Sequence, residues 1–462
     1  MGCRAWLAAT GFLLSAACSP GAPLESAAAV QDPARADNSG ASASAVAEPT
    51  SEGEAPTSEG EAAVELVTAG LPTVLHPSCQ TDGVVYDVIY ADGTFYLGGT
   101  FTSVGPPGAE PGGTVFASRE GIAACDADTG AVLPWYPPGG VDGQVRALAT
   151  DGTWLYVGGK FSDVGNLGHD NLARFSLSSA AGDESWRPSP DGQVRRIVVR
   201  PDGGMYVGGR FERIDGEAQA GIARLDAHGD LDDEFGPSVT LEGGGAAVFA
   251  VTESADGSAL YVGGQFDEVN GEPRASVVQL DAATGGETGA FSPDLEDTNP
   301  KDGVVQVHQI LLHDTGVYLC GDWWVTEGVG SQDAQRNLGR FDPDTGAADM
   351  DWLPSNDGGV ADCLFSDDGT SLIIGGHFDE VNGETARKLA ALDLDGARLV
   401  SGFPGGNSAQ GVRALGAASG GRLGIAGEFT KLGGEPHRGF GVVGFGADRP
   451  PRRFGETESP LR

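Results

Sequence analysis

The sequence is short of basic residues: 28 lysines and arginines stand against 66 aspartates and glutamates, for a formal net charge of −38. A protein that neutralises nucleic-acid phosphates needs a basic face, so nucleic acid is excluded as an expected partner. Helical periodicity is nearly absent, and the apolar run at residues 5–14 is too short for a permanent membrane span. These absences indicate a strand-rich protein.

Familiar catalytic phrases are absent too. The chain has no GxSxG elbow, no HExxH, and no GxGxxG or Walker phrase that opens a helix. We expect surface or turn positions for all seven histidines, which are His76, His169, His228, His308, His313, His377 and His437. We expect no catalytic residue and no cofactor, with calcium as the one alternative. We do not expect the chain to be an enzyme.

One phrase occurs seven times, about every 50–60 residues. It consists of a tyrosine or another apolar residue, an apolar residue, Gly-Gly, any residue and an aromatic, although the glycine pair is replaced by Cys320-Gly321 in the fifth copy and by Ala426-Gly427 in the seventh. Its second glycines are Gly99, Gly159, Gly209, Gly264, Gly321, Gly376 and Gly427. This period is typical of stacked β units, most often propeller blades. A glycine pair marks a close approach of two backbones, so we interpret these glycines as structural.

A second phrase, an aromatic with proline two positions later, follows each of the first five Gly-Gly pairs, and Phe403-Pro404 is a compressed sixth copy. The seventh copy is displaced: Leu75-His76-Pro77 stands before the first unit. The sequence therefore predicts an all-β, seven-bladed β-propeller of four-stranded blades over residues 66–448. Residues 71–76 would supply the outer strand of the last blade and close the ring.

Each unit is predicted to hold four short strands. In the second unit these are residues 145–149, 154–161 and 171–175 and a short strand at Trp186.

The N-terminus has the pattern of an export signal over residues 1–17: Arg4, a short apolar centre and small residues before Cys18. This resembles a bacterial lipobox, although Ser15 replaces the usual leucine. The resemblance implies lipid attachment at Cys18; the alternative is ordinary secretion. Residues 18–65 are predicted to be a disordered acidic tether and 449–462 a flexible tail. We expect an exported protein of the bacterial cell envelope, an outer-membrane lipoprotein.

Acidic turns follow several Gly-Gly phrases and are predicted to share one rim. The strongest copies contain Asp267, Glu268, Asp379 and Glu380. This rim either keeps the protein soluble or captures calcium or a basic partner. Calcium-dependent adhesion is therefore one alternative function.

The residue after each Gly-Gly differs from copy to copy, which indicates a binding surface rather than a purely structural position. Strand ends are also simply exposed, so both interpretations stay open. The candidate partner-binding residues are Thr100, Lys160, Arg210, Gln265, Asp322, His377 and Glu428. We expect a non-enzymatic binding or scaffolding module, a monomer, that presents one face to a protein or glycan at the envelope.

Cys79, Cys125, Cys320 and Cys363 remain once the signal and Cys18 are set aside. Three pairings are possible, and free thiols are a further possibility. Adjacent blades favour Cys320 with Cys363, which leaves Cys79 with Cys125.

Residues 256–271 followed by 279–281, together with 221–226 and 337–342, resemble the repeat of the bacterial delta-60 repeat β-propeller family. The resemblance covers about residues 70–446 and implies a secreted or surface propeller with no catalytic residues. The fifth copy departs from it, with Cys320 and Trp323-Trp324 in place of glycine and phenylalanine. Asp-rich turns such as 126–130 also resemble those of quinoprotein dehydrogenase propellers, so a propeller oxidoreductase is the alternative enzyme hypothesis.

Overall fold

The computed structural model describes residues 73–289, 291–295, 305–324, 336–400, 402–408, 411–418 and 421–444. The chain divides into two compact units, Met1–Ser58 and Glu59–Arg462, and every described residue belongs to the second. The predicted signal, lipidated Cys18, tether and tail lie outside the described residues. The described part contains no helix that is long and apolar enough to cross a membrane.

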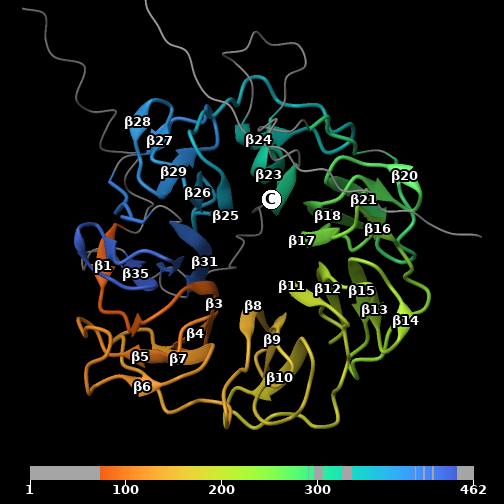
Figure 1. Ribbon diagram of the computed structural model, residues 1–462. Coiled ribbons are helices and arrows are strands. Elements are labelled where there is room, and N and C mark those ends of the chain that lie inside the picture. The colour runs from red at the N-terminus through yellow and green to blue at the C-terminus, as the bar shows by residue number, and fades with distance from the viewer. Residues whose placement is uncertain are drawn as a thin grey trace, which may run out of the picture. The chain divides into compact units, whose positions relative to one another are not determined.

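Large antiparallel sheets form this unit, and Figure 1 shows them following one another in chain order around a common centre. Five have three strands: β3 (Val85–Ala91), β4 (Thr94–Gly99) and β7 (Ile122–Asp126); β8 (Gln144–Thr150), β9 (Trp154–Lys160) and β10 (Leu172–Ser176); β11 (Gln193–Val199), β12 (Met205–Arg210) and β15 (Ile222–Leu225); β17 (Ala247–Glu253), β18 (Ala259–Gln265) and β21 (Val277–Asp281); β22 (Gln306–His313), β23 (Gly316–Trp324) and β24 (Arg336–Phe341).

Two further sheets have four strands. One has the order β25 (Val360–Phe365), β26 (Ser371–Gly376), β29 (Leu389–Asp393) and β30 (Leu399–Val400). The other joins the two ends of the unit, in the order β1 (Val74–His76), β35 (Phe440–Gly444), β32 (Arg422–Gly427) and β31 (Val412–Ala418). In it, Leu75 is in register with Val443.

Short strands at the turns complete the described secondary structure. Asn270 (φ 52°) and Gly271 (φ 85°) occupy the left-handed region, as an Asn-Gly hairpin turn requires. The short strands are β2 (Gln80–Thr81), β5 (Ser103–Gly105) and β6 (Ala117–Ser118); β13 (Arg213–Ile214) and β14 (Glu217–Ala218); β16 (Val239–Thr240), β19 (Glu268–Val269) and β20 (Glu272–Pro273); β27 (Glu380–Val381) and β28 (Glu384–Thr385); β33 (Lys431–Leu432) and β34 (Glu435–Pro436).

The apolar core lies between neighbouring sheets. Tyr96 of β4 packs in one cluster with Val145 and Leu155 of the following sheet. A further cluster joins the first large sheet to the last, with Phe95 and Phe440 in edge-to-face contact at 5.3 Å between ring centroids. Each sheet is therefore apolar on both faces, which explains why the inner strands show no alternation of apolar and polar residues.

The Gly-Gly pairs lie where backbones meet, as predicted. A Cβ atom on Gly158 would come within 2.5 Å of Val194 Cγ1 in the following sheet. A Cβ atom on Gly159 would overlap the carbonyl oxygen of Gln144 in the preceding strand of its own sheet. Even alanine is too large at either position without movement of the neighbour.

In the fifth phrase, Cys320 takes the place of the first glycine and forms a disulfide with Cys363 of β25. A second disulfide joins Cys79 to Cys125. This is the pairing that the sequence favoured, and the two bonds tie the first strand region to β7 and β23 to β25.

The tyrosine of each of five phrases packs against the aromatic of the second phrase. Centroid distances lie between 4.9 Å, for Tyr96 with Trp135, and 5.5 Å, for Tyr206 with Phe235. The other pairs are Tyr156 with Trp186, Tyr261 with Phe291, and Tyr318 with Trp352. We call these pairs, together with the Gly-Gly contacts, the framework contacts.

The prediction of four strands in each unit is wrong for the five three-stranded sheets. In the second sheet the expected strand at Trp186 is replaced by a single bridge between Phe175 and Gly182. Beyond that bridge the amide groups of Ser185 and Trp186 donate to the Asp183 carboxylate, at 3.0 and 3.3 Å. Because these donors are already satisfied by a side chain, they form no ladder with the sheet.

Candidate functional site

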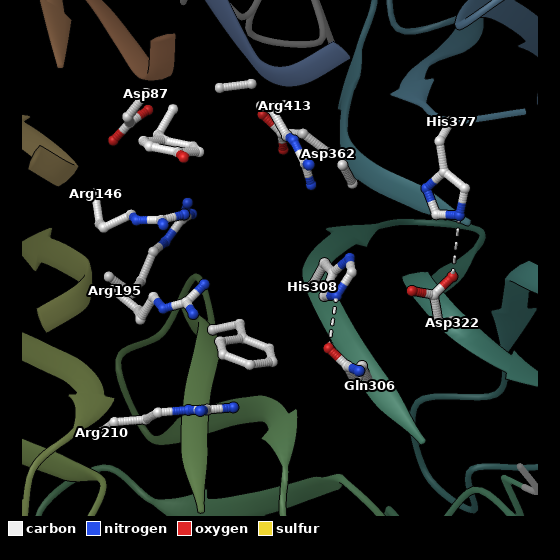
Figure 2. Close-up of a pocket in the computed structure, with 15 residues that line it drawn as sticks. Asp87, Arg146, Arg195, Arg210, Gln306, His308, Asp322, Asp362, His377 and Arg413 are labelled. Carbon is white, nitrogen blue, oxygen red and sulfur yellow. Dashed lines mark hydrogen bonds and ion pairs between the residues drawn. The ribbon is translucent and has the colours of Figure 1, made fainter. Parts of the chain in front are cut away.

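A cavity of about 410 Å³ lies among the first strands of the large sheets. This volume is in the usual range for small-molecule sites, about 300–1,000 Å³. Figure 2 shows Arg146, Arg195 and Arg210 along one side and His308, Asp322 and His377 along the other. The lining residues are Tyr86, Asp87, Arg146, Arg195, Arg196, Arg210, Phe249, Gln306, His308, Asp322, Ala361, Asp362, His377, Arg413 and Ala414.

A β-bulge at one fixed position of each first strand supplies much of this lining. In β8 the pairing with β9 shifts between Val145 and Ala147, so that Arg146 is the extra residue. A bulge re-aims a side chain out of the regular alternation. The seven extra residues, here called the bulge positions, are Tyr86, Arg146, Arg195, Phe249, His308, Ala361 and Arg413, and all of them line the cavity.

Neutral amide oxygens, rather than carboxylates, hold several of the arginines. Gln144 Oε1 accepts from both Nε and Nη2 of Arg146, at 3.1 and 2.7 Å. Gln193 Oε1 accepts from Arg195 Nε at 2.7 Å. Each glutamine stands two residues before its arginine, so the same strand supplies both groups. The glutamine fixes the guanidinium without cancelling its charge.

The same holds for two other arginines of the lining. Arg210 Nη2 donates to Gln265 at 2.7 Å, and Arg196 Nη2 donates to Gln309 at 3.3 Å. Within the described residues, Arg146, Arg195, Arg196 and Arg210 form no ion pair with a carboxylate. Their positive charge therefore remains directed at whatever occupies the cavity.

Aromatic rings support the guanidinium groups from adjacent sheets. The Arg146 guanidinium lies 3.6 Å from the ring centroid of Tyr86, and that of Arg195 lies 5.1 Å from the ring of Phe249. Phe249 in turn makes an edge contact with His308, at 5.6 Å between centroids. Stacking on a ring face restricts a long side chain while leaving its in-plane N–H donors available.

Mutual repulsion is visible at Arg195. Burial, followed by the neighbouring charges of Arg146 and Arg210, lowers the pKa of Arg195 to about 10, with Tyr86 acting in the opposite direction. Arg195 is still protonated at neutral pH. An anion placed among these groups would relieve the repulsion.

The opposite wall offers hydrogen-bond acceptors. Burial lowers the pKa of His308, although Asp322 and the bond to the Val360 carbonyl raise it. His308 Nδ1–H donates to that carbonyl at 3.2 Å, and His308 Nε2 lies 3.4 Å from Oε1 of Gln306 on the same strand (Figure 2). Asp322 Oδ1 lies 4.0 Å from Nε2 of His377, which accepts the Gly359 amide at 3.0 Å.

Two aspartates of the lining hold neighbouring sheets together. Asp87 accepts the amides of Val88 and, across the sheet boundary, Leu148, at 2.8 and 2.7 Å. Burial raises the pKa of Asp87 to about 6, against the lowering effects of the Leu148 bond and of Arg196. Asp362 likewise accepts the amide of Leu415 in the next sheet at 2.8 Å, and burial raises its pKa as well.

The candidate residues after Gly-Gly divide into two groups. Arg210, Asp322 and His377 line the cavity, and Gln265 contacts it through Arg210. The others, Thr100, Lys160 and Glu428, are not part of the lining, and the side chains of Lys160 and Glu428 are exposed. The role of the set as a partner-binding surface stays a prediction.

Sequence reasoning missed the bulge positions. A signal was available: each follows a valine that recurs at the start of the first strand, and the residue after that valine ranges from tyrosine to arginine, histidine and alanine. A bulge cannot be recognised from such a pattern. In an unbroken strand successive side chains point to opposite faces of the sheet, so the same residue would lie in a sheet interface.

The expected surface or turn position is wrong for three histidines. His308 lies in the cavity wall, while His169 and His437 are 2% and 7% exposed. His437 Nδ1 is 2.8 Å from Ser78 Oγ, a contact between the two ends of the unit. Long-range packing of this kind has no local sequence signal.

The acidic rim lies at the small hairpins. Asp267 accepts the Glu242 amide, Glu268 accepts the Thr240 hydroxyl at 3.1 Å, and Asp379 pairs with Lys388 at 2.9 Å. Glu380 is exposed in β27. Among the described residues, no group of three or more histidine, cysteine, aspartate or glutamate side chains is placed to hold a metal ion. Calcium binding at this rim stays a prediction.

Comparison with known proteins agrees with this geometry at the level of fold. Residues 200–235 match the family model described as a domain of unknown function (DUF5122) β-propeller. The matched stretch contains β12, with its Gly-Gly phrase, and β15, and it ends at Phe235. The described part of the chain is all-β and is similar to β-propellers. No curated protein matches the chain.

The solved structures to which the chain is similar share little sequence with it. The computationally designed Ika8 protein is 14% identical, covering 81% of this chain and 100% of its own, with a TM-score of 0.44. The WD40 β-propeller domain of Doa1 is 12% identical, covering 82% and 98%, with a TM-score of 0.46. The Cps50 (Swd1) β-propeller domain from Myceliophteria thermophila is 12% identical, covering 79% and 98%, at 0.45. Such values transfer no ligand, partner or activity to this chain.

Proposed function

We propose that this protein is an exported, lipid-anchored β-propeller that binds a ligand in its central cavity without transforming it. Its large sheets are the seven blades of a ring, and the pairing of β1 with β35 closes that ring. The envelope anchor is Cys18, and the partner is a molecule met outside the cytoplasm. The observation that carries the proposal is the convergence of the bulge positions on one cavity.

The pairing across the chain ends supports a closed ring. β1 and β35 are paired over three residues, and Ser78 Oγ donates to the Phe440 carbonyl at 3.3 Å. The first large sheet also shares an apolar cluster with the last. A ring of this kind leaves only short sheet edges at the outside of its blades.

The contrast between positions supports a binding role. Framework contacts repeat from sheet to sheet, whereas the bulge positions hold five residue types among seven sites. A position needed only for folding would tend towards one residue. The residues at the bulge positions can therefore vary without loss of the fold, and the ligand can determine which residues stand there.

The geometry favours binding over catalysis. A nucleophile needs a base within hydrogen-bond reach, about 2.6–3.2 Å. In the described lining His377 Nε2 lies 4.0 Å from Asp322 Oδ1 and accepts the Gly359 amide instead. His308 is oriented by a backbone carbonyl rather than by a carboxylate.

A retention experiment tests the binding function. The full chain is incubated with a small-molecule extract of the cell envelope, washed and denatured, and the released compounds are identified by mass spectrometry. We expect one compound to be retained and recovered chemically unchanged, and to be lost in Ala361→Trp, which fills the cavity from its smallest bulge position. Ala218→Trp, on the exposed strand β14, is the matched control and should retain it. Equal retention by both variants would place the site elsewhere, and recovery of a converted product would favour an enzyme.

Anchoring is tested separately. Cys18→Ser should abolish palmitate incorporation and move the protein from the membrane fraction to the soluble fraction. Unchanged labelling would remove the lipid anchor from the proposal and leave ordinary secretion.

A further inference from the structure

The cavity has two walls of different chemistry. The first carries the guanidinium groups of Arg146, Arg195 and Arg210, held by neutral glutamines (Figure 2). Facing it lie the Asp322 carboxylate, which accepts hydrogen bonds, and the His308 ring, whose Nε2 lies 3.4 Å from Oε1 of Gln306. A ligand that satisfies both walls needs an anionic group at one end and O–H or N–H donors at the other.

The charge of the rest of the chain limits the size of such an anion. The protein carries a formal net charge of −38, whereas five arginines face three aspartates in the lining. Two of those aspartates already accept backbone amides across sheet boundaries. A long polyanion would be repelled by the outer surface, but a small anion that fits within about 410 Å³ would meet mainly the arginines.

We propose that the cavity binds a small hydroxylated oxyanion, a sugar-like molecule carrying one phosphate or carboxylate group. Its anionic group lies against Arg146, Arg195 and Arg210, because planar guanidinium forks match the oxygens of phosphate and carboxylate. Its hydroxyl groups donate to the Asp322 carboxylate and lie beside the polar side chains of Gln306 and His308. This inference rests on the proposed binding function and specifies the ligand class of the same site.

Titration calorimetry of the full chain with four probes tests the inference. The probes are glucose 6-phosphate, glucuronate, glucose and inorganic phosphate. We expect at least one of the two charged sugars to bind ten-fold or more tightly than both glucose and inorganic phosphate. A difference of this size corresponds to about one charge-assisted contact. Which charged sugar binds more tightly distinguishes a phosphate from a carboxylate ligand. Glucose or inorganic phosphate binding as tightly as the charged sugars overturns the inference, as does the absence of binding by either charged sugar.

Variants assign the two walls. Arg195→Gln should weaken the bound charged sugar about 10- to 100-fold, with a smaller loss in Arg195→Lys, which keeps the charge without the fork. Arg213→Gln, at an exposed position of β13, is the matched control and should bind as the parent does. Asp322→Asn, which removes the carboxylate acceptor at nearly constant size, should bring the affinity for the charged sugar towards that for inorganic phosphate. Melting temperatures verify that each variant is folded. An Arg195→Gln variant that is folded and binds as the parent does contradicts the inference.

The two proposals can fail separately. If the retention experiment yields an uncharged compound that Ala361→Trp loses, the binding function stands and the oxyanion inference falls. If no compound is retained and neither charged sugar titrates, both fall.

Discussion

The framework contacts repeat one arrangement from sheet to sheet: a tyrosine against an aromatic, and a glycine against the valine in the first strand of the following sheet. At the bulge positions the backbone is equally regular, with the same shift in each first strand, yet the side chains differ. Both regions therefore share a repeated backbone. A substitution in the framework contacts would disturb packing between sheets. A substitution at a bulge position would change the charge and polarity of the cavity lining.

The fifth and sixth sheets show how the two regions can meet. Cys320 replaces a framework glycine and bonds to Cys363, and the adjacent Asp362 lines the cavity. Gly359 is required nearby, because a Cβ atom there would overlap the Asp322 carboxylate and approach the His377 ring. The disulfide thus lies beside the wall that carries the hydrogen-bond acceptors.

The largest expected effect concerns the closure of the ring. Deleting residues 71–77 removes β1 and should abolish cooperative folding, because the pairing of β1 with β35 and the packing of Leu75 on the last apolar cluster join the two ends of the unit. Circular dichroism melting checks this. Deleting residues 456–462, a segment of equal length at the other end, is the control. If the first deletion melts as the parent does, the closed ring is wrong.

A matched pair of aromatic substitutions separates framework from bulge. Trp186→Ala should lower the free energy of unfolding by about 3–5 kcal/mol, because Trp186 is 1% exposed and packs on Tyr156. Phe249→Ala, in the cavity wall, should cost about 1 kcal/mol. Urea denaturation of the two variants measures the difference. Equal losses would show that the bulge positions belong to the packing framework.

Removal of the disulfide between Cys320 and Cys363 should have an intermediate effect. The double variant Cys320→Ala with Cys363→Ala should lose about 2–4 kcal/mol, as expected for a loop of this length, with a sequence separation of 43. Denaturation under oxidising conditions measures the loss. The same variant in reducing buffer should match the reduced parent, and any remaining gap would point to packing rather than the crosslink.

The smallest effect is a pH dependence at Asp87. Its folded pKa is raised to about 6, so its contribution to stability is fully present below the unfolded pKa, near 4, and is lost as the pH rises through about 6. The change is on the order of 2–3 kcal/mol. It is measured as the difference between the parent and Asp87→Asn, whose side chain does not titrate. A difference that stays constant between pH 4 and 6 would contradict the raised pKa.

Much of the fold followed from local pattern. The Gly-Gly phrase located β4, β9, β12 and their counterparts, and the displaced Leu75 phrase pointed to the strand that pairs with β35. The outer strand at Trp186 did not follow, because the Asp183 side chain takes the amides that a ladder would have used. From the sequence alone, a segment whose amides bond to a nearby side chain cannot be distinguished from a short outer strand.

Only part of the candidate site could be predicted from the sequence. Arg210, Asp322 and His377 come from the recurring Gly-Gly phrase, so their shared end could be expected. Arg146, Arg195 and His308 could not, because a bulge depends on the pairing of two strands rather than on either strand alone.

By itself, the sequence determined the repeat, its period, the glycines at close backbone contacts and the acidic balance of the chain, since each depends on residue type and spacing. Only the tertiary structure decided which side chains meet. Seven bulges, separated by dozens of residues along the chain, turn their side chains into one cavity, and that convergence exists only when the sheets stand side by side. The positive charge gathered there within an acidic protein is a property of that packing.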